Sequence, residues 1–164
     1  AAAAGRGAGR LVAIDIDPEK LELARRLGAT DLIDARRDDP AAAVLELTGG
    51  NGVDVALEAS GGAGGPATAI ALARRGGTVV IIGLQKHPVA LDLLDLALRE
   101  IDVRASMAHV LADDLPEALA LLADGRLGDT VCGGLIGLEA LVPEGLDAIA
   151  AGRVHGKIVV DPWG

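Results

Sequence analysis

Short apolar runs alternate with segments of helical character along the first two thirds of the chain. Strands are expected where apolar and β-branched residues run together, at residues 11–16, 32–33, 53–57, 78–82 and 101–107. Helices are expected between them, at residues 18–27, 41–47, 66–75 and 91–99. Strands that alternate with helices of this length predict βαβ units, a parallel sheet, and right-handed crossovers that place helices on both faces.

Local signals mark the ends of several of these helices. The pairs Asp17-Pro18 and Asp39-Pro40 predict an N-cap followed by a proline in the first turn. Gly28 is expected to end the first of these helices, and Gly76-Gly77 the Ala-rich one. The unbroken apolar character of residues 11–16 indicates a strand that is covered on both faces.

The rhythm changes after Met107. A helix at 115–123, a strand at 130–136, a helix at 143–151 and a strand at 157–160 are expected there. We therefore predict an α/β fold with a doubly wound parallel sheet and a C-terminal α/β tail, divided into residues 1–107 and 108–164. The pattern leaves open whether the tail extends the sheet or joins a neighbouring domain.

Composition narrows the classes of function. The net charge of −9 disfavours a nucleic acid or an anionic membrane as partner, because both need a basic surface. No apolar run approaches the roughly 18 residues of a membrane span, and the first ten residues do not resemble a signal peptide. A single cysteine, Cys132, is expected to be a buried thiol in a reducing compartment, which favours the cytoplasm.

Candidate chemistry lies where the predicted strands end, because ligands of open parallel sheets bind outside the carboxyl ends of the strands. Asp15 ends the first strand and is suited to accept hydrogen bonds from the two ribose hydroxyls of NAD. Its charge would repel the 2′-phosphate of NADP. Lys20, in the next helix, is close enough in sequence to reach the same ribose. The two later strands are followed by Ala59-Ser60-Gly61 and by Gly83-Leu84, where small or glycine residues allow close approach of a flat ligand.

The other motifs give weaker evidence of function. The stretch Gly5-Arg6-Gly7-Ala8-Gly9 has G-x-G-x-G spacing and precedes a strand, so it is interpreted as a loop after a short helix at 1–4. His87, His109 and His155 are not spaced as metal ligands and are expected at the surface. Ser60 has no evident base partner in the sequence, so a nucleophilic role is not indicated.

Four segments taken in order resemble one family. They are VAIDIDPEKLELARRLGAT, GVDVALEASG, RRGGTVVIIG and HGKIVVDP, and they are similar to the medium-chain dehydrogenases, specifically the zinc-type alcohol, butanediol and sorbitol dehydrogenases. The resemblance implies a Rossmann-like NAD-binding domain without its first strand and G-x-G-x-x-G turn. It also implies a tail that packs on a catalytic domain, and hydride transfer between a secondary alcohol, diol or polyol and NAD.

The resemblance also implies residue roles. Asp15 and Lys20 correspond to ribose contacts, and the remaining cofactor contacts are Ala59, Ser60, Gly61, Ile82, Gly83, Leu84, Ser106 and Met107. An arginine that binds the pyrophosphate in some members is replaced here by Gly156-Lys157. No catalytic residue and no zinc ligand of the family is found in this chain, so zinc is expected only in the intact enzyme, and the chain alone is expected to be inactive.

Two further classes of function remain open on these residues. A stand-alone nucleotide-binding module is disfavoured because the sheet would have an open edge where the first strand is missing. A methyltransferase that binds S-adenosylmethionine also places an acidic residue at the end of its second strand, but the Gly83 turn and the HGKIVV ending favour the dehydrogenase. A small-molecule alcohol is the expected substrate. A homo-oligomer paired through the sheet edge near residues 101–107 is implied by the resemblance.

Overall fold

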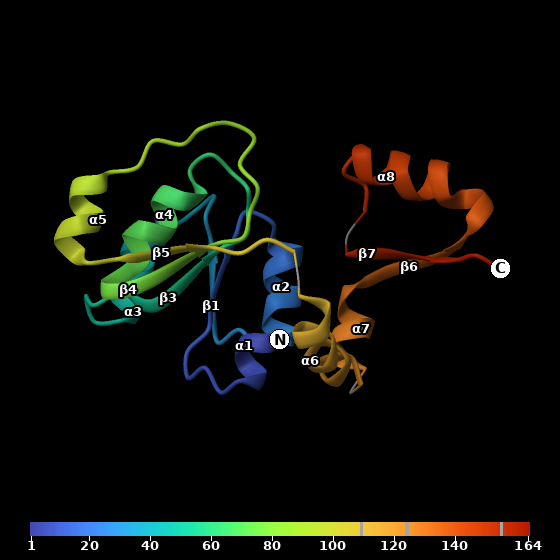
Figure 1. Cartoon of the computed structure of the whole chain (residues 1–164), viewed down its shortest axis with the longest axis horizontal. Coiled ribbons are helices and arrows are strands. Elements are labelled where there is room, and N and C mark those ends of the chain that lie inside the picture. The colour runs from blue at the N-terminus through green and yellow to red at the C-terminus, as the bar shows by residue number, and fades with distance from the viewer. Residues whose placement is uncertain (109, 124, 155) are drawn as a thin grey trace. The chain divides into compact units, whose positions relative to one another are not determined.

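The structure is a computed structural model, and it describes residues 1–108, 110–123, 125–154 and 156–164. The chain divides into two compact units. One unit contains residues 14–17 and 33–109, and the other contains residues 1–13, 18–32 and 110–164. Each unit is described by itself below, with the elements labelled as in Figure 1.

Three parallel strands form the centre of the first unit. They are β3 (Val53–Glu58), β4 (Ala73–Ile81) and β5 (Asp102–Ala105), hydrogen-bonded in the order β3-β4-β5. Glu58 pairs in register with Ile81, and Ile81 pairs with Ala105. The three strands therefore end side by side at one edge of the sheet, as parallel strands joined by helical crossovers must.

Helices α3 (Pro40–Leu47), α4 (Gly65–Leu72) and α5 (Leu93–Arg99) belong to the same unit. Helix α4 packs on β3 and β4, and its Ile70 joins Ala56 and the fully buried Val79 in the core. Small side chains such as these let a helix lie close to a sheet, which explains how a chain without Phe or Tyr builds a core. Asp39 caps α3 as expected, accepting a hydrogen bond from the backbone N–H of Ala41 at 2.9 Å.

Strands β1 (Val12–Asp15) and β2 (Asp31–Asp34) form a sheet of their own. These five strands thus form two separate sheets, β1-β2 and β3-β4-β5. The parallel sheet and its helices confirm the expected α/β fold.

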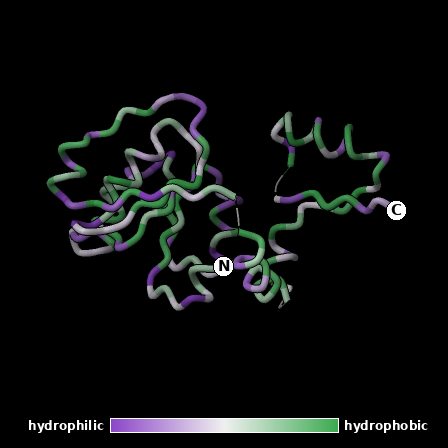
Figure 2. The backbone as a smooth tube through the Cα atoms, in the orientation of Figure 1, coloured by the Kyte–Doolittle hydropathy of each residue, from purple (hydrophilic) through white to green (hydrophobic). Residues whose placement is uncertain are grey.

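The other unit holds the tail and the helices near the start of the chain. Its helices are α1 (Ala2–Gly5), α2 (Pro18–Arg26), α6 (Leu111–Ala123), α7 (Arg126–Val131), the 3₁₀ turn η1 (Leu138–Ala140), the π-helix η2 (Leu141–Leu146) and α8 (Asp147–Ala150). Strands β6 (Cys132–Gly137) and β7 (Lys157–Asp161) pair in parallel, with Leu135 opposite Val159. Figure 2 shows hydrophobic positions in both of these strands.

Two expected boundaries in the middle of the chain were wrong. The Ala-rich helix ends at Leu72 instead of continuing to Arg75, and β4 begins at Ala73. Residues 73–77 are held beside β3 because Ala73 pairs with Val53 and the Arg74 guanidinium bonds the Asp54 carboxylate at 2.6 Å. These tertiary contacts override the helical preference of the Ala-Arg sequence.

The tail also differs from expectation in its details. Residues 126–131 are helical, so the expected strand at 130–136 begins only at Cys132. The expected helix at 143–151 is partly π-helical, and α6 begins four residues earlier than expected, at Leu111. Cys132 is exposed, which corrects the expectation of a buried thiol. Within the described residues, no helix has both the length and the apolar character needed to cross a membrane.

Candidate functional site

The loops that follow β3, β4 and β5 meet at the carboxyl edge of the three-stranded sheet. The backbone N–H groups of Ile82 and Gly83 both donate to the Glu58 carbonyl oxygen, at 2.8 and 2.9 Å. The Ser106 N–H donates to the Ile81 carbonyl oxygen at 2.9 Å. These bonds continue the parallel ladder beyond the strand ends, so they bring together eight of the ten residues expected to contact the cofactor: Ala59, Ser60, Gly61, Ile82, Gly83, Leu84, Ser106 and Met107.

Glu58, the last residue of β3, lies beneath two of these loops. Its side chain is only 4% exposed. Its Oε1 accepts hydrogen bonds from the Ser60 N–H at 2.9 Å, the Ser60 hydroxyl at 2.5 Å and the Gly61 N–H at 3.2 Å. Its Oε2 accepts one from the Gln85 side-chain amide at 2.9 Å. One carboxylate is thus bonded to the loop after β3 and to the loop after β4.

These bonds determine the charge state of Glu58. Burial by itself would raise the pKa of the carboxyl, but the hydrogen bonds donated by Ser60, Gln85 and Gly61 stabilise the ionised form and together lower the pKa below its usual range. The carboxylate is therefore a weak base. Ser60 does have a carboxylate partner, contrary to the sequence-based expectation, but that partner is poorly suited to activate the hydroxyl as a nucleophile.

Glycines allow the two loops to approach each other. Gly61 has a φ of 65°, and a Cβ atom there would lie 3.0 Å from the Leu84 carbonyl oxygen. A Cβ atom at Gly83 would lie 2.5 Å from the Glu58 Oε2 and would also collide with the Gly61 backbone nitrogen. Both positions therefore need glycine so that the backbones can pack around the carboxylate.

Apolar side chains surround this edge on the outside. Leu84 is 71% exposed and Met107 is 76% exposed, and Ile82 is also exposed. A group of exposed apolar side chains can mark a surface that binds a ligand or another protein. The predicted residues of the three loops are thus gathered in one place, with their apolar members accessible.

Asp15 and Lys20 lie on other elements. Asp15 ends β1 and is half-buried, and one of its oxygens accepts a hydrogen bond from the Asp17 N–H at 3.0 Å. A carboxylate has about four acceptor positions, so it retains capacity for a ligand. Lys20 is an exposed residue of α2. The structure places neither residue in the sheet of β3, β4 and β5, so the cluster of three loops is formed without them.

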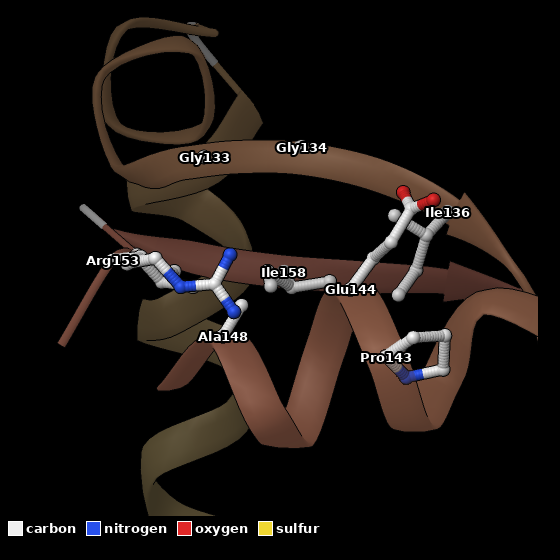
Figure 3. A pocket seen from close by; sticks show the side chains of 9 residues that line it. Gly133, Gly134, Ile136, Pro143, Glu144, Ala148, Arg153 and Ile158 are labelled. Carbon is white, nitrogen blue, oxygen red and sulfur yellow. The ribbon is translucent and has the colours of Figure 1, made fainter. Parts of the chain in front are cut away.

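A second candidate is a hollow beside β6 and β7, with a volume of about 420 Å³ (Figure 3). It is lined by apolar and glycine residues together with Glu144 and Arg153. None of the predicted cofactor residues lines it. No group of three His, Cys, Asp or Glu residues within the described part of the chain could hold a metal ion. His87 is exposed, as expected for a surface histidine, and His109 and His155 lie outside the described residues.

Comparison with known proteins identifies the class of protein. The zinc-binding dehydrogenase family matches residues 1–124. Sorbitol dehydrogenase of Bacillus subtilis (strain 168) is 35% identical over 126 residues, which are 76% of this chain and 35% of that protein. L-threonine 3-dehydrogenase of Bacillus velezensis (strain DSM 23117) is 32% identical over 164 residues, which are 99% of this chain and 47% of that protein.

Solved structures agree on the fold. The crystal structure of 2R,3R-butanediol dehydrogenase from Bacillus subtilis matches with a TM-score of 0.87 and 29% sequence identity, covering 98% of this chain and 46% of that one. With the parallel strands, the loop cluster and the family match, these similarities define a Rossmann-like dehydrogenase domain. The chain belongs to the zinc-binding dehydrogenase family. It spans between 35% and 47% of the length of these relatives.

Glu58 and Gln85 were missed by reasoning from the sequence. Glu58 directly precedes the expected contact Ala59, but a glutamate is rarely buried, so nothing marked it as part of the core. The alternation along the strand puts Glu58 on the face opposite Val55 and Leu57, so the sequence pattern favoured an exposed side chain, whereas the structure buries Glu58 and exposes those two residues. No local signal singled out Gln85, because its partner lies 27 residues away in sequence.

Proposed function

We propose that this chain is the NAD-binding portion of an oxidoreductase that transfers hydride between a secondary alcohol, diol or polyol and NAD. One observation carries the proposal. The loops after three parallel strands meet at one sheet edge, in a chain whose family is that of the zinc-binding dehydrogenases. Open parallel sheets bind dinucleotides at this edge.

Asp15 is proposed to bind the adenosine ribose. Its half-buried carboxylate can accept hydrogen bonds from both ribose hydroxyls, with Lys20 as a second contact to the same sugar. A 2′-phosphate in that position would face the negative charge, so NAD is favoured over NADP.

The loop cluster is proposed to hold the nicotinamide end. Ala59, Ser60 and Gly61 would lie along the cofactor, and Leu84 and Met107 would exclude water from one side of the ring. Ile82, Gly83 and Ser106 would complete this surface. NAD, when bound, supplies the hydride acceptor, and the residues of this chain bind and orient it. Zinc is not assigned to the described residues, because they contain no group of ligands for it.

The proposed substrate class follows from the relatives. Proteins similar to this chain are named for sorbitol, L-threonine, 2R,3R-butanediol and alcohols. The three named compounds share a secondary hydroxyl group. A small-molecule secondary alcohol, diol or polyol is therefore the substrate that we propose for the whole enzyme. These relatives support the dehydrogenase over a methyltransferase.

We also propose a cytoplasmic location and a homo-oligomer. A single exposed thiol, Cys132, suits a reducing compartment. Strand β5 lies at the edge of its sheet with all four residues exposed, so it is available to pair with a second copy.

Cofactor selection tests the proposed function. Calorimetric titration of the full chain is expected to show binding of NAD and weaker binding of NADP. Asp15→Ser should weaken NAD binding by about tenfold or more, since a hydrogen bond to a charged group contributes about 1.5–3 kcal/mol. Asp38→Ser is the matched control, because Asp38 is an exposed aspartate after β2, and it should bind NAD like the wild type.

Three results would contradict the proposal. They are a preference for NADP, equal NAD affinities of the Asp15→Ser variant and the wild type, or tight binding of S-adenosylmethionine with none of NAD. The last result would favour the methyltransferase.

A further inference from the structure

Glu58 is the only charged residue that is buried among those that the structure describes. Burying a carboxylate is unfavourable unless hydrogen bonds replace its hydration. The fold places this group at the end of β3, where no cationic side chain of the described residues forms an ion pair with it, and surrounds it with donors from two loops. A position of this kind needs a reason beyond packing, because an apolar side chain would fill the space at lower cost.

We propose that Glu58 is a positioning residue for the cofactor site, which sets the spacing of the loops after β3 and β4. The inference rests on the proposed function, since it concerns the same sheet edge. It assigns a role to Glu58 and Gln85, which are not expected to contact the cofactor themselves.

The two carboxylate oxygens serve different loops. Oε1 accepts from Ser60 and Gly61, whose neighbour Ala59 is also an expected cofactor contact. Oε2 accepts from Gln85, which follows Gly83 and Leu84. A single rigid carboxylate therefore links the two loops expected to contact the cofactor, in addition to the backbone bonds of Ile82 and Gly83 to the Glu58 carbonyl oxygen. The glycines at positions 61 and 83 let both loops close on it.

A neutral amide holds the two loops less strongly than the carboxylate does. A carboxylate accepts hydrogen bonds at both oxygens, whereas a glutamine side chain accepts at its oxygen and donates at its nitrogen. In Glu58→Gln the amide oxygen can still accept from Ser60 and Gly61, and the Gln85 amide can turn so that its oxygen accepts from the new amide nitrogen. The bonds are kept, but each loses the charge that makes a bond to a carboxylate strong. Changing residue 85 to glutamate in that variant restores a charged acceptor between the two loops, with the new amide nitrogen as its donor.

The test combines these variants in the full chain. We would measure the NAD dissociation constant by calorimetry and the thermal unfolding midpoint for the wild type, Glu58→Gln, Gln85→Ala and the double variant Glu58→Gln/Gln85→Glu. Glu46→Gln is the matched control, because Glu46 is an exposed glutamate of α3.

Glu58→Gln is expected to weaken NAD binding several-fold, because hydrogen bonds to a neutral acceptor are weaker than those to a carboxylate. The double variant should recover part of that loss, and Glu46→Gln should bind like the wild type. Gln85→Ala frees only the loop after β4, so it should fold like the wild type and still bind NAD several-fold more weakly. It therefore tests the proposal if Glu58→Gln does not fold.

Two results would overturn the inference while leaving the proposed function intact. In the first, the wild type binds NAD and folded Glu58→Gln or Gln85→Ala binds it equally well. In the second, the double variant folds like the wild type and shows no recovery. If the wild type binds no NAD at all, the proposed function itself fails, and the inference fails with it.

Discussion

Glu58 is a charged residue that is buried at the end of β3. A buried carboxylate that receives hydrogen bonds from Ser60, Gly61 and Gln85 is ionised in the fold and stabilises it in that state. Because its pKa is lowered in the folded chain, the unfolded chain takes up a proton first as the pH falls. The stability that Glu58 contributes is thus fully present above the usual glutamate range and is lost as the pH falls through the lower, folded-state pKa.

Acid titration of stability tests this at the residue scale. Glu58→Gln should reduce the free energy of unfolding at neutral pH and flatten its fall with acid, because glutamine does not titrate. Urea unfolding at a series of acid and neutral pH values measures both effects. Asp54→Asn is the control: the pKa of Asp54 is also lowered, by its hydrogen bond to Arg74, but the exposed pair should change the curve much less. A Glu58→Gln curve parallel to that of the wild type would contradict the prediction.

At the scale of elements, Arg99 joins α5 to the end of α4. Its guanidinium donates to the Ile70 and Ala73 carbonyl oxygens, each at 2.9 Å, and it bonds the Asp95 carboxylate one turn earlier in α5. Carbonyl groups in the last turn of a helix lack partners within the helix. Arg99 therefore satisfies acceptors where the chain leaves α4 and enters β4, which is also where the sequence-based boundary was wrong.

Replacing this arginine tests its role. Arg99→Met keeps much of the apolar stem and removes the donors, so we expect the free energy of unfolding to fall by about 1–3 kcal/mol. Chemical denaturation measures the change. The matched control is Arg104→Met, since the ion pair of Arg104 with Asp102 is exposed and is expected to contribute no more than about 1 kcal/mol. Equal losses in the two variants would show that the contacts with the end of α4 contribute nothing measurable.

At the scale of the whole molecule, the proposed cofactor surface is only one of the parts that a dehydrogenase needs. The loop cluster offers a surface for a cofactor, but the described residues contain no group of metal ligands. The exposed apolar residues also include Val55 and Leu57 of β3, so one side of this strand lacks a cover in the chain as described. A sheet face of this kind is normally packed against other elements.

We therefore expect the isolated 164-residue chain to have no dehydrogenase turnover. The purified chain would be incubated with NAD and, separately, sorbitol, 2R,3R-butanediol and L-threonine, and NADH formation followed by absorbance. The B. subtilis sorbitol dehydrogenase serves as positive control with sorbitol. Steady alcohol-dependent NADH formation by this chain would contradict the prediction.

Much of the fold could be predicted from local patterns. The strand at 78–82 and the helix after Asp39-Pro40 were found because β-branched runs and capping signals act over a few residues. The end of α4 was not found, because contacts of Arg74 with Asp54 and of Arg99 with α4 determine it from about 20 and 29 residues away in sequence. The exposure of Cys132 was not predicted either, because it depends on the position of this residue at the start of β6.

The sequence by itself determined the alternation of strands and helices, and therefore the sheet edge at which Ser60, Gly83 and Ser106 would meet. Parallel strands joined by crossovers must end on the same side, so the order of elements was sufficient for this. Only the tertiary structure showed that Glu58 is buried between the loops and bonded to Gln85. A hydrogen bond between residues distant in sequence depends on loop geometry, and local propensity contains no information about it.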